Sequence, residues 1–261
     1  MLDELWIRSL HVSSLRHREL HPEYADHVVF QASTIGALLD GAYEGDVTVG
    51  ELAEHGDHGL GTLNGLDGEL IVIDGDFVRA QPSGKVEPVP SQALTPFAAV
   101  AWFSPEIAFN LPPSATLEGL AAEIEARVPD PEASLAIRVD GEFELVRARS
   151  VPRQQPPYRP LMEVVAGQSV FELEQVEGSL IGFRFPDQSA GIEVGGYHLH
   201  FVTIDRRRGG HVLGFRAGDE LSVAADSESD LRVELPPGVD LEAPSTDDEM
   251  QAALDSVERA G

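Results

Sequence analysis

The sequence predicts an α+β fold with hairpin-rich mixed β-sheets. We expect two domains, each of which combines α-helices with β-strands (α/β two-domain). Short apolar runs rich in β-branched residues recur along the 261 residues, several of them separated by Asp-Gly. Helical patterns are few, and strands and helices do not alternate regularly as in a doubly wound fold. The proline-rich stretch 151–160 is the best candidate for a boundary. We expect an N-terminal sheet domain over 1–155 and a C-terminal one over 156–261.

The first elements expected are a strand and two short helices. VVFQ (28–31) predicts a strand, and Ser33 and Thr34 can cap a helix that runs over 35–42. Thr48 and Glu51 have the spacing of a capping box, which predicts a second short helix that ends at Gly56.

Hairpins and one amphipathic helix follow. Residues 69–80 predict a hairpin around Asp74-Gly75, and residues 134–151 repeat this pattern around Asp140-Gly141. FAAVAWF (97–103) predicts a buried strand. TLEGLAAEIEARV (116–128) has the period of an amphipathic helix.

The C-terminal part predicts more strands and one final helix. Ser245 is a candidate N-cap for TDDEMQAALDSVERA (246–260), in which Leu254 and its neighbours form an apolar stripe. The apolar runs expected to be strands are 169–176, 178–185, 197–204, 211–215, 220–224 and 231–235.

The composition is strongly acidic. The 45 acidic residues against 18 basic ones give a net charge of −27, and Lys85 is the only lysine. Such a surface repels nucleic acid and anionic membranes, so we expect neither as a partner. Lysine scarcity with a large acidic excess is typical of a halophilic protein, whose self-repulsion is screened in a salt-rich cytosol.

The chain has no cysteine, no apolar run of membrane-spanning length and no signal-peptide pattern at its start. We therefore expect a cytoplasmic protein. Disulfides, thiolate nucleophiles and cysteine-ligated metals are excluded, so a transition-metal site must use His, Asp or Glu.

The strongest chemical signal is GYHLHFVTIDRRRGGHVLGF (196–215). His198 and His200 point to one face of a strand because side chains alternate along it. A turn centred near Asp205 would bring His211 level with them, and three imidazoles with open positions are typical of a catalytic zinc site. Gly209 and Gly210 are expected to supply the backbone freedom of that turn.

Two alternatives remain open from this pattern. The histidines could lie on the solvent face of a hairpin while the intervening apolar residues form the core. A turn centred nearer Arg208 would also move His211 away from the pair. The other histidines show no such spacing and are interpreted as surface or turn residues; they are His11, His17, His21, His27, His55 and His58.

Several ordered blocks together resemble the acetolactate decarboxylase family, from about residue 28 to the C-terminal helix. The blocks are HGDHGLGTLNGLDGELIVIDGDF (55–77), TPFA (95–98), RSVPRQ (149–154), VEGSLIGFRFP (176–186) and the histidine stretch. The resemblance implies two α/β domains with a zinc site between them, held by His198, His200 and His211. It also implies a homodimer.

The resemblance also implies the residues around the metal. Carried over by motif, they are Thr62 of GLGT, Glu69 of LDGEL and Arg149 before the VPRQ segment. A C-terminal glutamate corresponds to Glu258, which lies at i+4 from Leu254 and so at the edge of the helix's apolar face.

The reaction implied is the decarboxylation of 2-acetolactate to acetoin and CO2. Zinc would polarise the ketone and stabilise an enediolate. Arg149 would hold the departing carboxylate or act on the enediolate, Glu69 and Glu258 would manage protons, and Thr62 would hydrogen-bond nearby. Two alternatives are another three-histidine metal enzyme, such as a β-scaffold dioxygenase, and a catalytically inactive metal-binding module.

Overall fold

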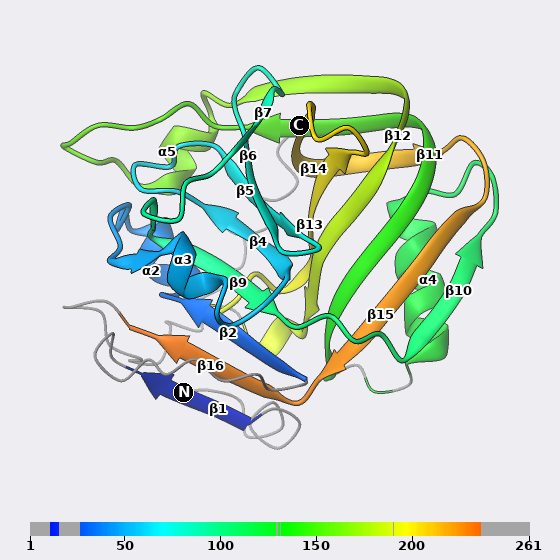
Figure 1. The fold of residues 1–261 in the computed structure, drawn as a ribbon, viewed down its shortest axis with the longest axis horizontal. Helices are drawn as coiled ribbons and strands as arrows, with labels where there is room; N and C mark the ends of the chain where they lie inside the picture. Colours follow the sequence, from blue (N-terminus) through cyan, green and yellow to red (C-terminus); the bar gives the residue numbers. More distant parts are fainter. Residues whose placement is uncertain (1–10, 16–26, 129, 131, 190, 236–261) are drawn as a thin grey trace.

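Two large β-sheets pack against each other in the computed structural model of the chain (Figure 1). The structure describes residues 11–15, 27–128, 130, 132–189 and 191–235. The helix expected over 246–260, and Glu258 with it, lies outside these residues. Sheet is by far the commonest structure and helices are few and short, which agrees with the expected α+β class.

The first sheet has eight strands in the order β1-β16-β2-β9-β4-β5-β6-β7 and mixes parallel and antiparallel pairs. Its strands from β4 to β7 form an antiparallel meander that carries the hairpin expected at Asp74-Gly75. The strands are β1 (His11–Leu15), β2 (Val28–Ala32), β4 (His58–Thr62), β5 (Glu69–Ile73), β6 (Asp76–Ala80), β7 (Val86–Pro88), β9 (Phe97–Ala101) and β16 (Asp230–Glu234).

The second sheet has six strands in the order β10-β15-β11-β12-β13-β14. Strand β14 also pairs with β11, so β11, β12, β13 and β14 close into a ring without a free edge among them. The strands are β10 (Ile107–Leu111), β11 (Ser134–Ser150), β12 (Ser169–Phe185), β13 (Gly196–Thr203), β14 (Gly209–Ala217) and β15 (Leu221–Glu228).

The short elements lie outside these sheets. Strands β3 (Val47–Thr48) and β8 (Leu94–Thr95) form a two-stranded ladder, and Asp187–Ser189 is a short 3₁₀ turn, η2. The helices are α2 (Ile35–Leu39), α3 (Val49–Leu52), α4 (Leu117–Arg127) and α5 (Leu161–Val165).

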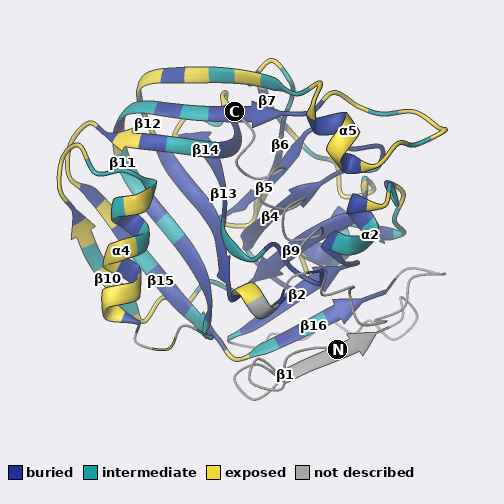
Figure 2. Ribbon diagram, turned by 180° about the vertical axis from the view of Figure 1, so that it is seen from behind, coloured by how far each residue is buried: buried dark blue, intermediate teal, exposed yellow. Residues whose placement is uncertain are grey.

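The helix starts follow the capping patterns of the sequence. The Thr34 hydroxyl accepts a hydrogen bond from Ala37 N, and Thr48 and Glu51 form the expected capping box. Both helices are shorter than expected, because α2 ends at Leu39 and α3 at Leu52. Helix α4 buries Leu120 and Ile124 against the second sheet and turns its exposed residues outward (Figure 2).

The hairpin expected around Asp140-Gly141 is wrong. Residues 134–150 form one bent strand, β11, which pairs with β12 from Leu135 to Ser150. Its first half also pairs with β15 and its second half with β14, so the chain continues through Gly141 to join two sets of partners. The apolar runs 169–176 and 178–185 are likewise one strand, β12.

Each large sheet contains strands from both sides of residue 155. Strands β10 and β11 precede this position and belong to the second sheet, whereas β16 follows it and lies between β1 and β2 of the first. The sheets therefore do not coincide with segments 1–155 and 156–261. The predicted boundary between two domains at residues 155 and 156 stays a prediction.

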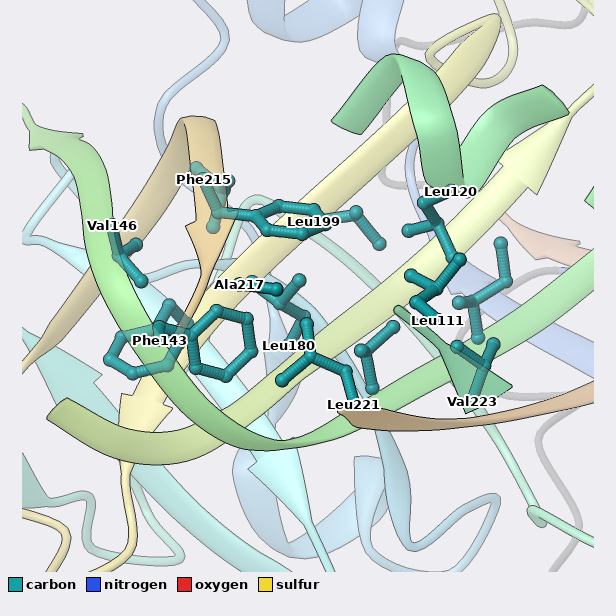
Figure 3. Packing of buried hydrophobic residues seen from close by; sticks show 14 of the residues in the cluster. Leu111, Leu120, Phe143, Val146, Leu180, Leu199, Phe215, Ala217, Leu221 and Val223 are labelled. Carbon is teal, nitrogen blue, oxygen red and sulfur yellow. The ribbon is translucent and has the colours of Figure 1, made fainter. Parts of the chain in front are cut away.

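Apolar side chains fill the interior on both faces of the second sheet. On one face, Phe143, Leu180 and Leu199 pack with Leu120 of α4 (Figure 3). On the other face, Phe183 of β12 packs with Leu60 and Leu231 of the first sheet. This shared core fixes the two sheets together and so positions the side chains that project between them. No helix among the described residues is long and apolar enough to cross a membrane.

Candidate metal centre and active site

The histidines converge because of the register between β13 and β14. His200 lies directly opposite His211 in this antiparallel pair. The connecting turn occupies residues 203–208, where Arg206 N donates to Thr203 O and Thr203 N donates to Arg208 O. The turn is thus centred near Asp205, as one of the two sequence interpretations required, and His198 lies on the same face as His200.

Gly209 and Gly210 do not form the turn. They are the first residues of β14, and their role is close packing. A Cβ on Gly209 would lie 2.4 Å from Phe201 O, and one on Gly210 would lie 2.8 Å from Arg149 O. Glycine therefore lets β14 approach both neighbouring strands closely enough to present His211.

The three imidazoles fit a metal ion. One ligand atom of each histidine lies within 4.8 Å of those of the other two, and all three residues are buried. His200 Nδ1 lies 2.7 Å from Leu70 O, and because a carbonyl only accepts, Nδ1 carries the proton. The Nε2 lone pair of His200 is then available to a metal, with the ring oriented by the backbone, as is usual for ligand histidines.

The surroundings keep the imidazoles of His198 and His200 neutral, as metal ligation requires. Burial, with a smaller effect of the Arg149 guanidinium, lowers the pKa of His198 to about 3. Burial lowers the pKa of His200 well below its ordinary value, and His198 and Arg149 add to this effect.

Arg149 is placed beside the histidines by β11. It lies directly opposite His211 in the β11–β14 pair, so Arg149, His211 and His200 form a row across three adjacent strands. Its side chain is buried and reaches the same pocket. The guanidinium thus places a buried positive charge beside the three histidines, in a pocket that the Glu69 carboxylate also lines.

Glu69 and Thr62 come from the other sheet. They are directly opposite each other in the β4–β5 pair, and both line the pocket. Glu69 Oε1 accepts a hydrogen bond of 3.3 Å from Val151 N, and its Oε2 lies 3.7 Å from His200 Nε2. The Thr62 hydroxyl donates to Gly68 O at 2.8 Å, which leaves its oxygen as an acceptor toward the pocket.

The pocket has an apolar wall that the sequence analysis did not assign to the site. Half of its residues lie on α2 and α5, and the others lie between β4 and β5, at the start of β9 and just after β11; the residues are Ile35, Leu38, Leu66, Phe97, Val151 and Leu161. Apolar residues in short helices read as ordinary core in a single sequence, so no signal marked them. The pocket lining therefore combines polar residues, among them Arg149 and the histidines, with a set of apolar residues.

The structure thus brings together Thr62, Glu69, Arg149, His198, His200 and His211. Glu258 lies outside the described residues. The interpretation of the isolated histidines as surface or turn residues holds for His55, which lies in a turn after α3 although it is buried. It is wrong for His58, which is buried on β4 and stacks on Phe103 with its Nε2 3.2 Å from Gly182 O.

Comparison with known proteins decides the family. The sequence model described as Alpha-acetolactate decarboxylase matches residues 29–243, most of the chain. The chain belongs to the alpha-acetolactate decarboxylase family. The resemblance inferred from the sequence blocks is therefore confirmed, and so is the expectation of an enzyme of the carboxy-lyase class.

Individual alpha-acetolactate decarboxylases are similar over nearly their whole length. The one from Methylococcus capsulatus is 44% identical over 236 residues, covering 90% of this chain and 90% of its own. The one from Methanosarcina mazei is 42% identical, covering 90% of this chain and 81% of its own. The crystal structure of the Bacillus subtilis strain 168 enzyme superposes with a TM-score of 0.83 at 35% identity, covering 88% of this chain and 99% of that one.

Proposed function

We propose that this chain catalyses the zinc-dependent decarboxylation of 2-acetolactate to acetoin and CO2. The observation that carries the proposal is one pocket that holds three buried histidines beside a buried arginine, in a chain of this family. In the reaction the C–CO2 bond breaks, CO2 leaves, and the electron pair left on carbon finally takes up a proton.

The metal would be held by His198, His200 and His211, between the two sheets. Neutral imidazoles suit zinc, and three of them leave coordination positions open for a substrate. When bound, the ion supplies a Lewis acid for the substrate ketone, which is the electron sink that the bond cleavage needs. The backbone contact from Leu70 O to His200 would keep that ligand in the orientation required.

Arg149 would bind and orient the substrate carboxylate. A guanidinium forms paired hydrogen bonds with a carboxylate, and its burial makes these stronger than they would be in water. After CO2 leaves, the same positive charge would stabilise the negative charge left on the product side. Because Arg149 lies on one side of the pocket, it is also a candidate for setting product chirality.

Glu69 and Thr62 would handle hydrogen bonds at the substrate hydroxyl. Glu69 Oε1 is held by Val151 N, so the carboxylate is fixed while Oε2 faces the histidines. The Thr62 oxygen can accept a hydrogen bond from the substrate hydroxyl or a water, since its own proton is donated to Gly68 O. We propose Glu258 as a second carboxylate of the site by its place in the family pattern.

The apolar wall would take the methyl groups of the substrate and exclude water. Side chains such as Ile35, Leu38 and Phe97 cannot hydrogen-bond, so they favour the alkyl side of 2-acetolactate opposite its charged side. This division orients the substrate before the bond breaks.

The test is to offer racemic 2-acetolactate to the purified protein in high salt with zinc, and to measure acetoin and its chirality. Formation of one acetoin enantiomer, lost on chelation and restored by zinc, supports the proposal. Zinc bound without acetoin formation would indicate a metal-binding module. Iron in the purified protein together with oxygen consumption would indicate a dioxygenase.

We further propose a homodimer in a halophilic cytoplasm, without nucleic-acid or membrane partners. The charge of −27 supports the halophilic part, since such a surface is least self-repelling at high ionic strength.

A further inference from the structure

A second cluster of buried polar groups lies where the chain passes from one sheet to the other. Asp226 near the end of β15 is fully buried and connects three segments there. Its Oδ1 lies 3.0 Å from His27 Nδ1, just before β2, and its Oδ2 accepts a hydrogen bond of 2.7 Å from Ser104 N, between β9 and β10.

Glu228 and Ser134 lie next to Asp226 on the same face. Ser134 is directly opposite Glu228 in the β11–β15 pair, and Asp226 is directly opposite Ala136. Ala136 packs in the apolar cluster between the sheets, so this face of β15 points into the interior. Side chains directly opposite in an antiparallel pair have Cβ atoms about 5 Å apart, so Ser134 and Glu228 adjoin.

These groups are buried without the partners that buried polar atoms normally have. Glu228 is 4% exposed and Ser134 is 1% exposed. Within the described part of the chain, the Glu228 carboxylate oxygens and Ser134 Oγ have no hydrogen-bond partner. Unsatisfied oxygens of two different residues at one place point to a ligand that satisfies both.

We propose that Glu228, Asp226 and Ser134 form a binding site for a hard cation, with Ca²⁺ as the ion that fits best. Carboxylate and hydroxyl oxygens are the donors that Ca²⁺ prefers, and it accepts irregular sets completed by water. Without an ion, burial and the neighbouring Asp226 carboxylate raise the pKa of Glu228 to about 9, so a bound cation would take the place of a proton and offset both carboxylates. It also links β15 and β11 of one sheet to the segments that enter β2 and β16 of the other.

The site is separate from the proposed zinc centre in donor type and in residues. Its three proposed donors are oxygen atoms of Glu228, Asp226 and Ser134, and none of these residues lines the active-site pocket. We expect the bound cation to stabilise the folded protein, and its removal should not abolish acetoin formation at the proposed zinc centre.

The experiment is a titration of the zinc-loaded protein with calcium chloride. Calorimetry measures the heat of binding, and thermal unfolding at each calcium concentration measures the melting temperature. Concentrated choline chloride keeps the ionic strength constant, so that general screening of the acidic surface does not imitate binding. We expect one saturable site per chain, with a Kd on the order of 10⁻⁴ M for so few ligand charges, and a melting temperature that rises with occupancy.

Variants assign the site. Glu228→Gln should remove the saturable heat and the calcium-dependent rise in melting temperature, whereas Glu174→Gln, which removes an exposed charge from β12, should retain both. Ser134→Ala, which keeps both carboxylates, should weaken binding several-fold and covers the case in which Glu228→Gln does not fold. Absence of a saturable site in the unaltered protein, or unchanged binding in the foldable variants, overturns the proposal; Glu228 is then a buried neutral acid.

Discussion

His200 and His211 lie directly opposite each other in the antiparallel pair β13–β14, and Arg149 lies opposite His211 on its other side. The ladder register therefore sets both the spacing of the histidines and the place of the arginine beside them. A slip of one residue would turn His211 to the opposite face, so the site depends on the six-residue turn that fixes this register.

Removal of any of the three pocket histidines should remove the proposed metal. We expect His198→Ala, His200→Ala and His211→Ala each to abolish stoichiometric zinc and acetoin formation, because two imidazoles do not make a catalytic site. Metal analysis by mass spectrometry and an acetoin assay measure the two effects. His55→Gln changes a buried histidine outside the pocket and should keep both. A His211 variant with full zinc and normal turnover would refute the ligand assignment.

Arg149→Lys tests whether the forked guanidinium is needed. Lysine keeps the charge but cannot form paired hydrogen bonds with a carboxylate, so we expect kcat/KM to fall about 10- to 100-fold. Zinc content should not change. Arg153→Lys, at a largely exposed arginine just beyond the pocket, is the matched control and should have wild-type kinetics. Equal kinetics for both variants would exclude carboxylate binding by Arg149.

Leu38→Ala should change substrate preference by opening the apolar wall. We expect a lower kcat/KM for 2-acetolactate and a higher relative rate for a homologue with a longer 2-alkyl group, because the added space takes the extra methylene. Leu39→Ala is the control, since Leu39 is buried on the same helix but does not line the pocket. Competition between the two substrates measures the preference. The same shift in both variants would show a general loosening of α2.

His58 should make the protein sensitive to acid. Burial lowers the pKa of His58 to about 4, against an ordinary 6.5, although its hydrogen bond to Gly182 O opposes the shift. The unfolded chain therefore binds the proton first as the pH falls. The stabilisation is complete above pH 6.5 and is lost progressively down to pH 4, by about 3 kcal/mol.

His58→Gln tests this because glutamine can still donate to Gly182 O but does not titrate. Urea unfolding at intervals from pH 7.5 to 4 measures the free energy of unfolding of both proteins. The three histidines of the pocket are the same in both proteins, so their contribution to the free energy of unfolding cancels in the difference. We expect the variant to become more stable relative to the unaltered protein as the pH falls from 6.5 to 4. If the difference between their free energies of unfolding stays constant with pH, His58 is not the source of the acid sensitivity.

Salt should stabilise the protein strongly. With 45 acidic and 18 basic residues, repulsion within the folded chain falls as the Debye length shortens to about 3 Å near 1 M salt. We expect the melting temperature to rise between dilute buffer and molar KCl. A melting temperature that stays level would contradict a halophilic protein.

The sequence by itself determined the local elements whose signals are local. Asp74 and Gly75 both adopt positive φ, as the hairpin turn expected there requires, and Thr34, Thr48 and Glu51 cap their helices through contacts three residues away. The same reasoning failed at Asp140-Gly141, where an equally good turn signal lies within a continuous strand because β12 pairs across it, with Asp140 opposite Ser179 and Gly141 opposite Gly178.

The sequence also supplied the three histidines of the candidate metal centre and the spacing of His198 and His200, and the ordered blocks indicated the family. Only the tertiary structure decided which turn joins β13 to β14, that Arg149 stands beside His211, and that Thr62 and Glu69 of the other sheet face the same pocket. The physical reason is that capping and turn formation depend on neighbours in the chain. Strand register and sheet packing depend on partners as far apart as the 131 positions between Glu69 and His200, which no local pattern specifies.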